Sequence, residues 1–433
     1  MHKTYQKNAR RASDATEAAV PVAAISLAEA IESAKEGLLA LAVGTGLQVM
    51  QAMFDDDVER LCGLRDQHNP GRAGYRHGRE SGAVTLGGRR LAVGRPRVRT
   101  PDGCRELPLP SYELFRGTEV LGRLALERML AGLSTRRYPL GLEPVGSEVA
   151  ASAVGTRKST VSRRFVVATE TALAELLARR LAELDLVALL LDGVHFAESC
   201  RVVALGIDLQ GVKHPLAVVE GSTENATLVR GLLVDLRERG LDVTRPILVV
   251  IDGAKALRSA VVDVFDHPVI QRCQQHKLQK VKDKLPQRLR SVVERRMRVA
   301  YHAASTVDAE AQLRALAHEL EKTHPGAAAS LREGLDETLT VVALGLPSTL
   351  ARTMRSTNPI ESMLTICRER SKNVKRLRDG QMALRWCAAG MVAAGTQFRR
   401  VNGYLHLPAL RDALERHVSS QPTSEKRYSD DAA

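Results

Sequence analysis

The chain has 433 residues, 44% of them apolar and only 3% aromatic, so aliphatic side chains must fill its core. It carries 63 Lys and Arg against 50 Asp and Glu, a net charge of +13. This basic balance favours polyanionic partners, nucleic acid first, over a surface kept basic for solubility alone.

Six scattered cysteines without a framework spacing fit a reducing compartment. The first twenty residues hold no apolar core of signal-peptide length, and no stretch reaches about 18 uninterrupted apolar residues. We therefore expect a cytoplasmic protein without a membrane partner.

The first part of the chain predicts a polar tail, a helix and a basic hairpin. Residues 24–64 have helical periodicity. Residues 83–100, AVTLGGRRLAVGRPRVRT, alternate around a Gly-Gly pair, which is typical of a β-hairpin. Its arginines have no acid near them in sequence before Asp102, so a solvated ribbon face and a contact to the DNA backbone are equally supported. They are Arg89, Arg90, Arg95, Arg97 and Arg99.

Residues 118–183 predict two further helices. The first ends at Gly132, and the second begins with a capping hydroxyl near Ser159. Such a pair suits a helix-turn-helix, in which the start of the second helix meets DNA, although an ordinary surface pair is equally supported. The candidate DNA-binding residues are Lys158, Ser159, Thr160, Arg163 and Arg164.

From residue 186 the pattern becomes strand-like. Three short apolar runs, a helix, a strand, a helix and a strand predict a mixed α/β sheet. The expected strands are 186–193, 200–208, 213–221, 245–252 and 268–273. Residues 277–345 are helical and charged without a strand signal, which indicates an insertion.

Two carboxylates occupy matching places in this sheet. Asp192 in LLLDG and Asp252 in VVIDG each close an apolar strand. Strand ends are where α/β sheets bind ligands, and two adjacent carboxylates favour a divalent cation, Mg²⁺ or Mn²⁺. The alternative is a pair of plain turn residues, which is how we interpret Asp208 and Asp266.

A third carboxylate is needed if two ions, about 4 Å apart, are to act on a phosphodiester. Glu361 is the candidate, in the first turn of a helix that we expect Asn358 to cap. The basic stretch that follows is a candidate contact to the DNA backbone. It contains Arg368, Arg370, Lys372, Lys375, Arg376 and Arg378.

Two further features have competing interpretations. Cys273-x-x-His276 is either half of a zinc site or a core cysteine beside a surface histidine, and no second pair with suitable spacing accompanies it. Trp386, the only tryptophan, fits core packing better than stacking on an extruded base.

Taken together and in this order, nine short stretches across residues 60–410 resemble the bacterial insertion-sequence transposases of the Mutator type, a branch of the DDE transposases. They are GLSTRRY (132–138), KSTVSRRF (158–165), LLLDGVHF (189–196), GSTEN (221–225), DLRERGL (235–241), LVVIDGAKAL (248–257), QRCQQHK (271–277), STNPIES (356–362) and RWCAAGM (385–391).

The resemblance implies a ribonuclease H-like catalytic domain with a metal triad of Asp192, Asp252 and Glu361. It also implies that Cys273 and His276 belong beside the active site. An Asn common in the family after this block is replaced here by residues 278–280, Leu-Gln-Lys. The implied segments are tails at 1–23 and 418–433, a helical region 24–66, a basic hairpin region 67–117, a helix-turn-helix-like region 118–183, catalytic parts 184–276 and 346–417, and a helical insertion 277–345.

The implied activity is binding of terminal inverted repeats, metal-dependent DNA cleavage with two Mg²⁺ or Mn²⁺ ions, and strand transfer into target DNA. Joining two ends implies at least a homodimer, associated with the nucleoid when bound to DNA. Two alternatives are an inactive transposase-derived DNA-binding regulator and a related ribonuclease H-like nuclease.

Overall fold

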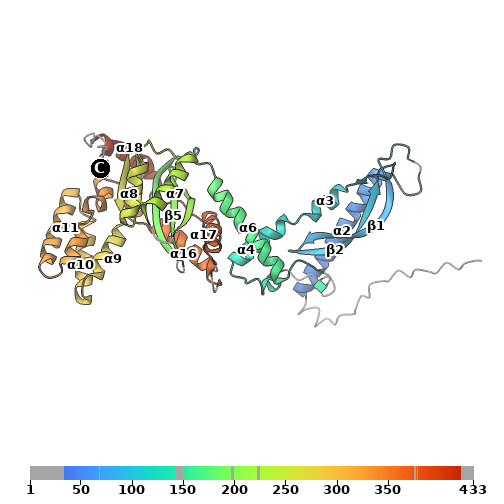
Figure 1. The fold of residues 1–433 in the computed structure, drawn as a ribbon, viewed down its shortest axis with the longest axis horizontal. Coiled ribbons are helices and arrows are strands. Elements are labelled where there is room, and N and C mark those ends of the chain that lie inside the picture. Colours follow the sequence, from blue (N-terminus) through green and yellow to red (C-terminus); the bar gives the residue numbers. More distant parts are fainter. Residues whose placement is uncertain are drawn as a thin grey trace, which may run out of the picture. The chain divides into compact units, whose positions relative to one another are not determined.

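The computed structural model describes residues 34–420 apart from 68, 143–149, 152, 197–198, 222–224, 375–376 and 378. These residues form two compact units. One comprises the described residues up to Gly117 with those of 142–154; the other comprises Thr118–Gly141 and the described residues from Gly155 onward (Figure 1). The tail expected at 1–23 and residues 421–433 of the tail expected at 418–433 lie outside the described residues. Residues 418–420 belong instead to the last helix, Leu407–Ser420, so the predicted start of that tail is wrong.

The first unit packs one long helix against a β-hairpin. Gly87 and Gly88 form the predicted turn, with φ of 58° and 76°, which only glycine adopts readily and which a tight hairpin requires. Helix and hairpin share one core around Phe54, Val84 and Leu91. The elements are α2 (Ala34–Cys62), β1 (Tyr75–Leu86), β2 (Arg89–Arg99), β3 (Glu106–Leu107) and α3 (Pro110–Arg116).

Two of the hairpin arginines, which have no acid close to them in sequence before Asp102, have acidic partners in the folded chain. Arg95 and Arg97 both pair with Glu80 on the neighbouring strand and with Glu106 on β3. Sequence distance hides these partners because Glu80 lies directly opposite Arg95 in the hairpin register. Arg89 is buried, at 8% exposure.

The second unit begins with two helices, α4 (Glu119–Leu130) and α6 (Lys158–Ala178), with the short η1 (Tyr138–Gly141) between them. Helix α4 ends just before Gly132, as predicted. Helix α6 begins one residue before Ser159, and Arg157 occupies its cap position without a side-chain cap, so the predicted hydroxyl cap is wrong. The helices pack together, but residues 131–157 separate them, far more than the turn of about four residues in a helix-turn-helix.

All five predicted strands are present in one mixed sheet. They are β4 (Leu186–Phe196), β5 (Ser199–Asp208), β6 (Lys213–Gly221), β7 (Ile247–Ile251) and β8 (Pro268–Arg272), in the order β6-β5-β4-β7-β8. β4, β5 and β6 are antiparallel neighbours, whereas β7 and β8 run parallel to β4.

The prediction that a strand stops at Asp192 is wrong. β4 continues to Phe196 because β5 pairs with it along its whole length, with Asp192 opposite Val203. Only the parallel pairing of β4 with β7 ends at Leu191. Asp192 is therefore the first residue of β4 that lies beyond the end of its pairing with β7.

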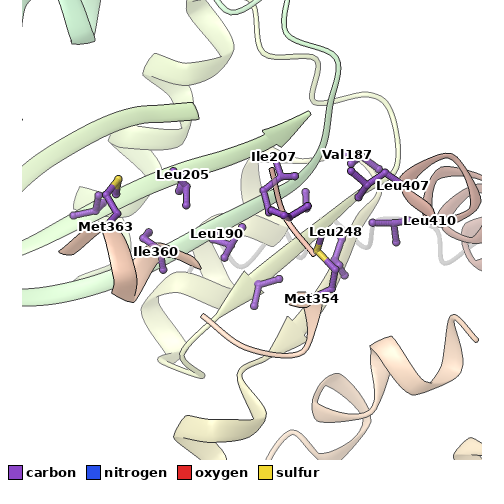
Figure 2. Packing of buried hydrophobic residues seen from close by; sticks show 14 of the residues in the cluster. Val187, Leu190, Leu205, Ile207, Leu248, Met354, Ile360, Met363, Leu407 and Leu410 are labelled. Carbon is purple, nitrogen blue, oxygen red and sulfur yellow. The ribbon is translucent and has the colours of Figure 1, made fainter. Parts of the chain in front are cut away.

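Helices cover both faces of the sheet. Because side chains alternate along a strand, Leu189 and Leu191 enter one core with α7 (Ala226–Glu238) and α8 (Lys255–Val264). Leu190 and Leu248 enter the other core, which they share with Ile360 and Met363 (Figure 2). The helices of that second face are α15 (Ser348–Met354), α16 (Asn358–Ser371), α17 (Gly380–Gly395) and α18 (Leu407–Ser420), with η2 (Tyr404–His406) before α18.

The insertion between β8 and α15 is all-helical, as predicted, and has its own apolar core. Buried polar contacts hold it to the sheet: the Gln271 side chain donates to the carbonyl of Thr338 (2.9 Å), and Thr340 donates to that of Ile270 (2.6 Å). The start of the insertion also contacts the residue that follows α15 (Ser348–Met354): the backbone amide of Gln274 donates to the carbonyl of Arg355 (2.9 Å). Its helices are α9 (Gln274–Asp283), α10 (Gln287–Ala300), α11 (Thr306–Glu321), α12 (Pro325–Arg332), α13 (Leu335–Thr338) and α14 (Thr340–Ala343).

Among the helices of the described residues, none is long and apolar enough to cross a bilayer.

Candidate active site

Three residues lie side by side where β4, β7 and β8 stop pairing in parallel. Leu191 is in register with Ile251, and Ile251 is in register with Arg272. The following residues, Asp192, Asp252 and Cys273, therefore occupy the same level of the sheet on adjacent chains, which are spaced by about 4.8 Å.

Their side chains share one face. Leu190 and Val250, two residues before the two aspartates, both enter the core beneath α16, and alternation carries Asp192 and Asp252 to the same side. Asp192 is buried, with 6% of its surface exposed, whereas Asp252 is half-buried. One carboxylate oxygen of Asp252 accepts the amide of Ala254 (2.8 Å), which fixes the turn after β7.

Helix α16 positions Glu361 over this edge. Ile360, Met363 and Leu364 are buried against the sheet, and α16 packs on β4. Glu361 falls in the first turn of the helix and keeps 39% of its side chain exposed. The cap position belongs to Thr357 rather than to Asn358, so that prediction is wrong.

A compact polar cluster joins the end of β8 to the start of α16. Among the described residues, Cys273, His276 and Glu361 form a group whose possible ligand atoms all lie within 4.8 Å of one another. His276 Nδ1 is 3.8 Å from a Glu361 carboxylate oxygen. Thr357 lies between them, with its hydroxyl donating to Glu361 at 2.6 Å. The cluster places Glu361 beside the strand edge that holds both aspartates.

The cluster is electrostatically coupled to the first aspartate. Interaction with Cys273 raises the pKa of His276 to about 9, and the charges of Asp192 and Glu361 act in the same direction. Burial acts in the opposite direction. Burial opposes ionisation of the Cys273 thiol, but hydrogen bonds from His276 and Thr357 outweigh it and lower its pKa. A charged imidazole therefore faces acidic groups from both β4 and α16.

The predicted DNA-binding residues differ in how they are engaged. At the start of α6, Lys158, Ser159 and Arg163 are exposed, whereas Arg164 donates to the carbonyl of Gly155 (2.6 Å). Thr160 is half-buried.

On α16, Arg368 is exposed, as is Lys372 just beyond the helix, while Arg370 donates to the carbonyl of Leu130 at the end of α4 (3.2 Å). Lys375, Arg376 and Arg378 lie outside the described residues.

Trp386 packs in a core. It is 6% exposed and lies against Phe165 of α6, with ring centroids 4.6 Å apart. Leu130 and Ala389 complete the cluster around it. This burial supports core packing rather than stacking on an extruded base.

Asp208 and Asp266 lie away from the strand ends that carry the cluster. Asp208 accepts from His214 (2.7 Å) and from the amide of Val212 (2.8 Å), within the turn between β5 and β6. Asp266 is exposed and precedes β8, at the opposite end of that strand from Cys273.

This geometry defines a mixed α/β protein with acidic residues and a Cys–His pair at one sheet edge. Residues 16–400 match the family described as "Transposase, Mutator family". The chain belongs to the Mutator family of transposases.

Curated relatives are insertion-sequence transposases. The chain is 30% identical over 287 residues to the transposase for insertion sequence element IS6120 of Mycolicibacterium smegmatis, covering 65% of this chain and 86% of that protein. It is 24% identical over 368 residues to the transposase for element ISRM5 of Rhizobium meliloti, covering 84% and 90%. A third similarity, 29% over 176 residues, is to the transposase for element IST2 of Acidithiobacillus ferrooxidans, covering 41% and 58%.

Proposed function

We propose that this chain cleaves DNA at the ends of an insertion sequence and joins the freed 3′-hydroxyl to target DNA, with Asp192, Asp252 and Glu361 as the catalytic carboxylates. The observation that carries the proposal is the strand register, which puts both aspartates at one edge and on the face that α16 covers. The family and its relatives support the same activity.

The order of these features supports a ribonuclease H-like catalytic domain. In chain order, the first strand of the sheet, β4, carries Asp192, and the fourth, β7, is followed directly by Asp252. A helix beyond the insertion, α16, carries Glu361. A rigid sheet core behind the two aspartates limits their movement, which is what a site that works by positioning needs.

The donor set fits Mg²⁺ or Mn²⁺. Three carboxylates offer hard oxygen ligands, and Asp192 is buried at the same level of the sheet as Asp252, where a cation would stabilise both carboxylates. When bound, two such ions supply charge stabilisation for the attacking and leaving oxygens of a phosphodiester exchange. The ligands would be Asp192, Asp252 and Glu361.

Basic residues near this edge suit the DNA backbone. Lys280 on α9 is exposed, and its ammonium lies 3.4 Å from the backbone carbonyl of Asp252, beside the carboxylates. Arg368 on α16 is exposed on the helix that carries Glu361. We assign these two side chains to phosphates flanking the reacting bond, because fixed cations hold a polyanion in register without reading its sequence.

The experiment that tests the function is a strand-cleavage assay on DNA carrying the inverted repeats that flank the coding region. We expect nicking at the repeat ends with Mg²⁺, loss of nicking with EDTA, and recovery when Mn²⁺ is added. DNA with shuffled ends is the matched control. Specific end binding without cleavage in any divalent metal would favour the regulator alternative, and equal cleavage of branched, unrelated DNA would favour the nuclease.

End recognition is expected to depend on the start of α6. The double variant Lys158→Ala and Arg163→Ala removes two exposed cations, so binding to the repeats should weaken and the slope of log affinity against log salt should fall by about 2. Filter binding across a salt series measures both. Arg164→Ala is a poor choice because that side chain holds Gly155; Arg180→Ala, beyond the other end of α6, is the matched control.

A further inference from the structure

Thr357 stands at the centre of the cluster beside the proposed active site. Its surface is fully buried, at 0% exposure. Its hydroxyl lies 2.6 Å from a Glu361 oxygen, 3.3 Å from Cys273 Sγ and 3.3 Å from His276 Nδ1. One small hydroxyl therefore contacts all three polar groups.

The hydroxyl has a single proton, so these contacts cannot all be donations. The contact to Glu361 is the shortest and has a carboxylate acceptor, so the proton belongs there. Cys273 Sγ instead receives two backbone amides, from Thr357 at 3.4 Å and from His276 at 3.5 Å. The hydroxyl oxygen is then left to accept from the His276 ring.

The same atom argues against a zinc site. A zinc ion bound by Cys273, His276 and Glu361 would sit about 2.0–2.3 Å from each ligand atom, near the middle of the group. The ligand atoms lie within 4.8 Å of one another, and the Thr357 oxygen is within 3.3 Å of each of them. The Thr357 hydroxyl therefore competes with a metal for all three ligand atoms.

We propose that Thr357 is a positioning residue for Glu361, and that Cys273 and His276 hold Thr357 rather than bind a metal. The backbone amide of Thr357 is fixed on the Cys273 sulfur, and its hydroxyl fixes one oxygen of Glu361, which leaves the other oxygen for a divalent ion. The inference rests on the proposed role of Glu361 in the transposition reaction. It gives the Cys-x-x-His pair a specific role, which is to hold Thr357 at the start of α16, 84 residues after Cys273 in the sequence.

The test compares Thr357→Val, which keeps the shape and removes the hydroxyl, with Thr357→Ser, which keeps the hydroxyl. Calorimetric titration of Mn²⁺ into the full-length protein reads the site without catalysis. We expect Thr357→Val to weaken Mn²⁺ binding by about 10- to 100-fold, the range for groups that orient a ligand, and to lower cleavage with it. Thr357→Ser is expected to stay within about threefold of wild type, because the hydroxyl that orients Glu361 remains.

Thr365→Val is the matched control, because Thr365 lies on the same helix and its hydroxyl bonds only to the carbonyl of Glu361 (2.9 Å) in an exposed position. It should bind Mn²⁺ and cut DNA as wild type does. Wild-type Mn²⁺ binding by Thr357→Val would overturn the inference, as would stoichiometric Zn²⁺ binding to the wild type that is lost in Cys273→Ser. Absence of cleavage by the wild type in any divalent metal would instead contradict the proposed function.

Discussion

Asp192→Asn is expected to reduce strand cleavage in Mg²⁺ by at least about 10³-fold while leaving binding to the terminal repeats close to wild type. The substitution removes a buried negative charge that acts on the His276 ring, with almost no change in side-chain volume. Losing a ligand from the proposed ion site removes several kcal/mol of transition-state stabilisation, and about 4 kcal/mol corresponds to that rate. Single-turnover cleavage of end-labelled repeat DNA measures the effect.

Asp266→Asn is the matched control, since it makes the same chemical change at an exposed position before β8, away from the strand ends that carry the cluster. Its cleavage rate should stay within about twofold of wild type, because it lies on the surface at the opposite end of β8 from Cys273. Undiminished cleavage by Asp192→Asn would refute the site. Loss of repeat binding as well would mean that the variant has lost its fold or its DNA surface.

Leu190→Ala is expected to destabilise the second unit by about 2–5 kcal/mol. Leu190 is 1% exposed in the middle of β4 and packs beneath α16 with Leu248, Ile360 and Met363 (Figure 2). Truncation leaves a cavity that the rigid sheet fills poorly. This core also fixes the position of α16, which carries Glu361, relative to the strand ends. Cleavage should therefore fall even at temperatures where the variant remains folded.

Urea denaturation followed by circular dichroism measures the loss, and Leu405→Ala serves as control because Leu405 is 74% exposed in η2. The control should change stability by no more than about 0.5 kcal/mol. A midpoint for Leu190→Ala equal to wild type would contradict the packing between β4 and α16.

The five strands and the insertion could be predicted because apolar runs bounded by turns, and helices without strand signals, are local patterns. What failed depended on pairing across the chain. The continuation of β4 past Asp192 depends on β5, and the neutralisation of Arg95 depends on Glu80 across the hairpin. The predicted cap was two residues from the observed one at Ser159 and one residue at Asn358, within the usual uncertainty of helix ends.

The residues of the candidate site also differ in whether the sequence alone could identify them. Asp192, Asp252 and Glu361 stand out as acids at element ends, and the pair Cys273 and His276 as a recognisable spacing. Thr357 carries no such signal, because a threonine before a helix is ordinary and its partner Cys273 is 84 residues away. Only the folded chain brings its hydroxyl into the cluster.

The segment that holds the inserted helices and α15 begins and ends at one place, where the backbone amide of Gln274 donates to the carbonyl of Arg355. Because the two ends of this segment meet, a change in the length of chain between them need not move Glu361, which follows Arg355 on α16. The inserted helices are therefore a suitable place for new protein contacts to evolve, or for a fluorescent domain to be fused, while Glu361 keeps its position.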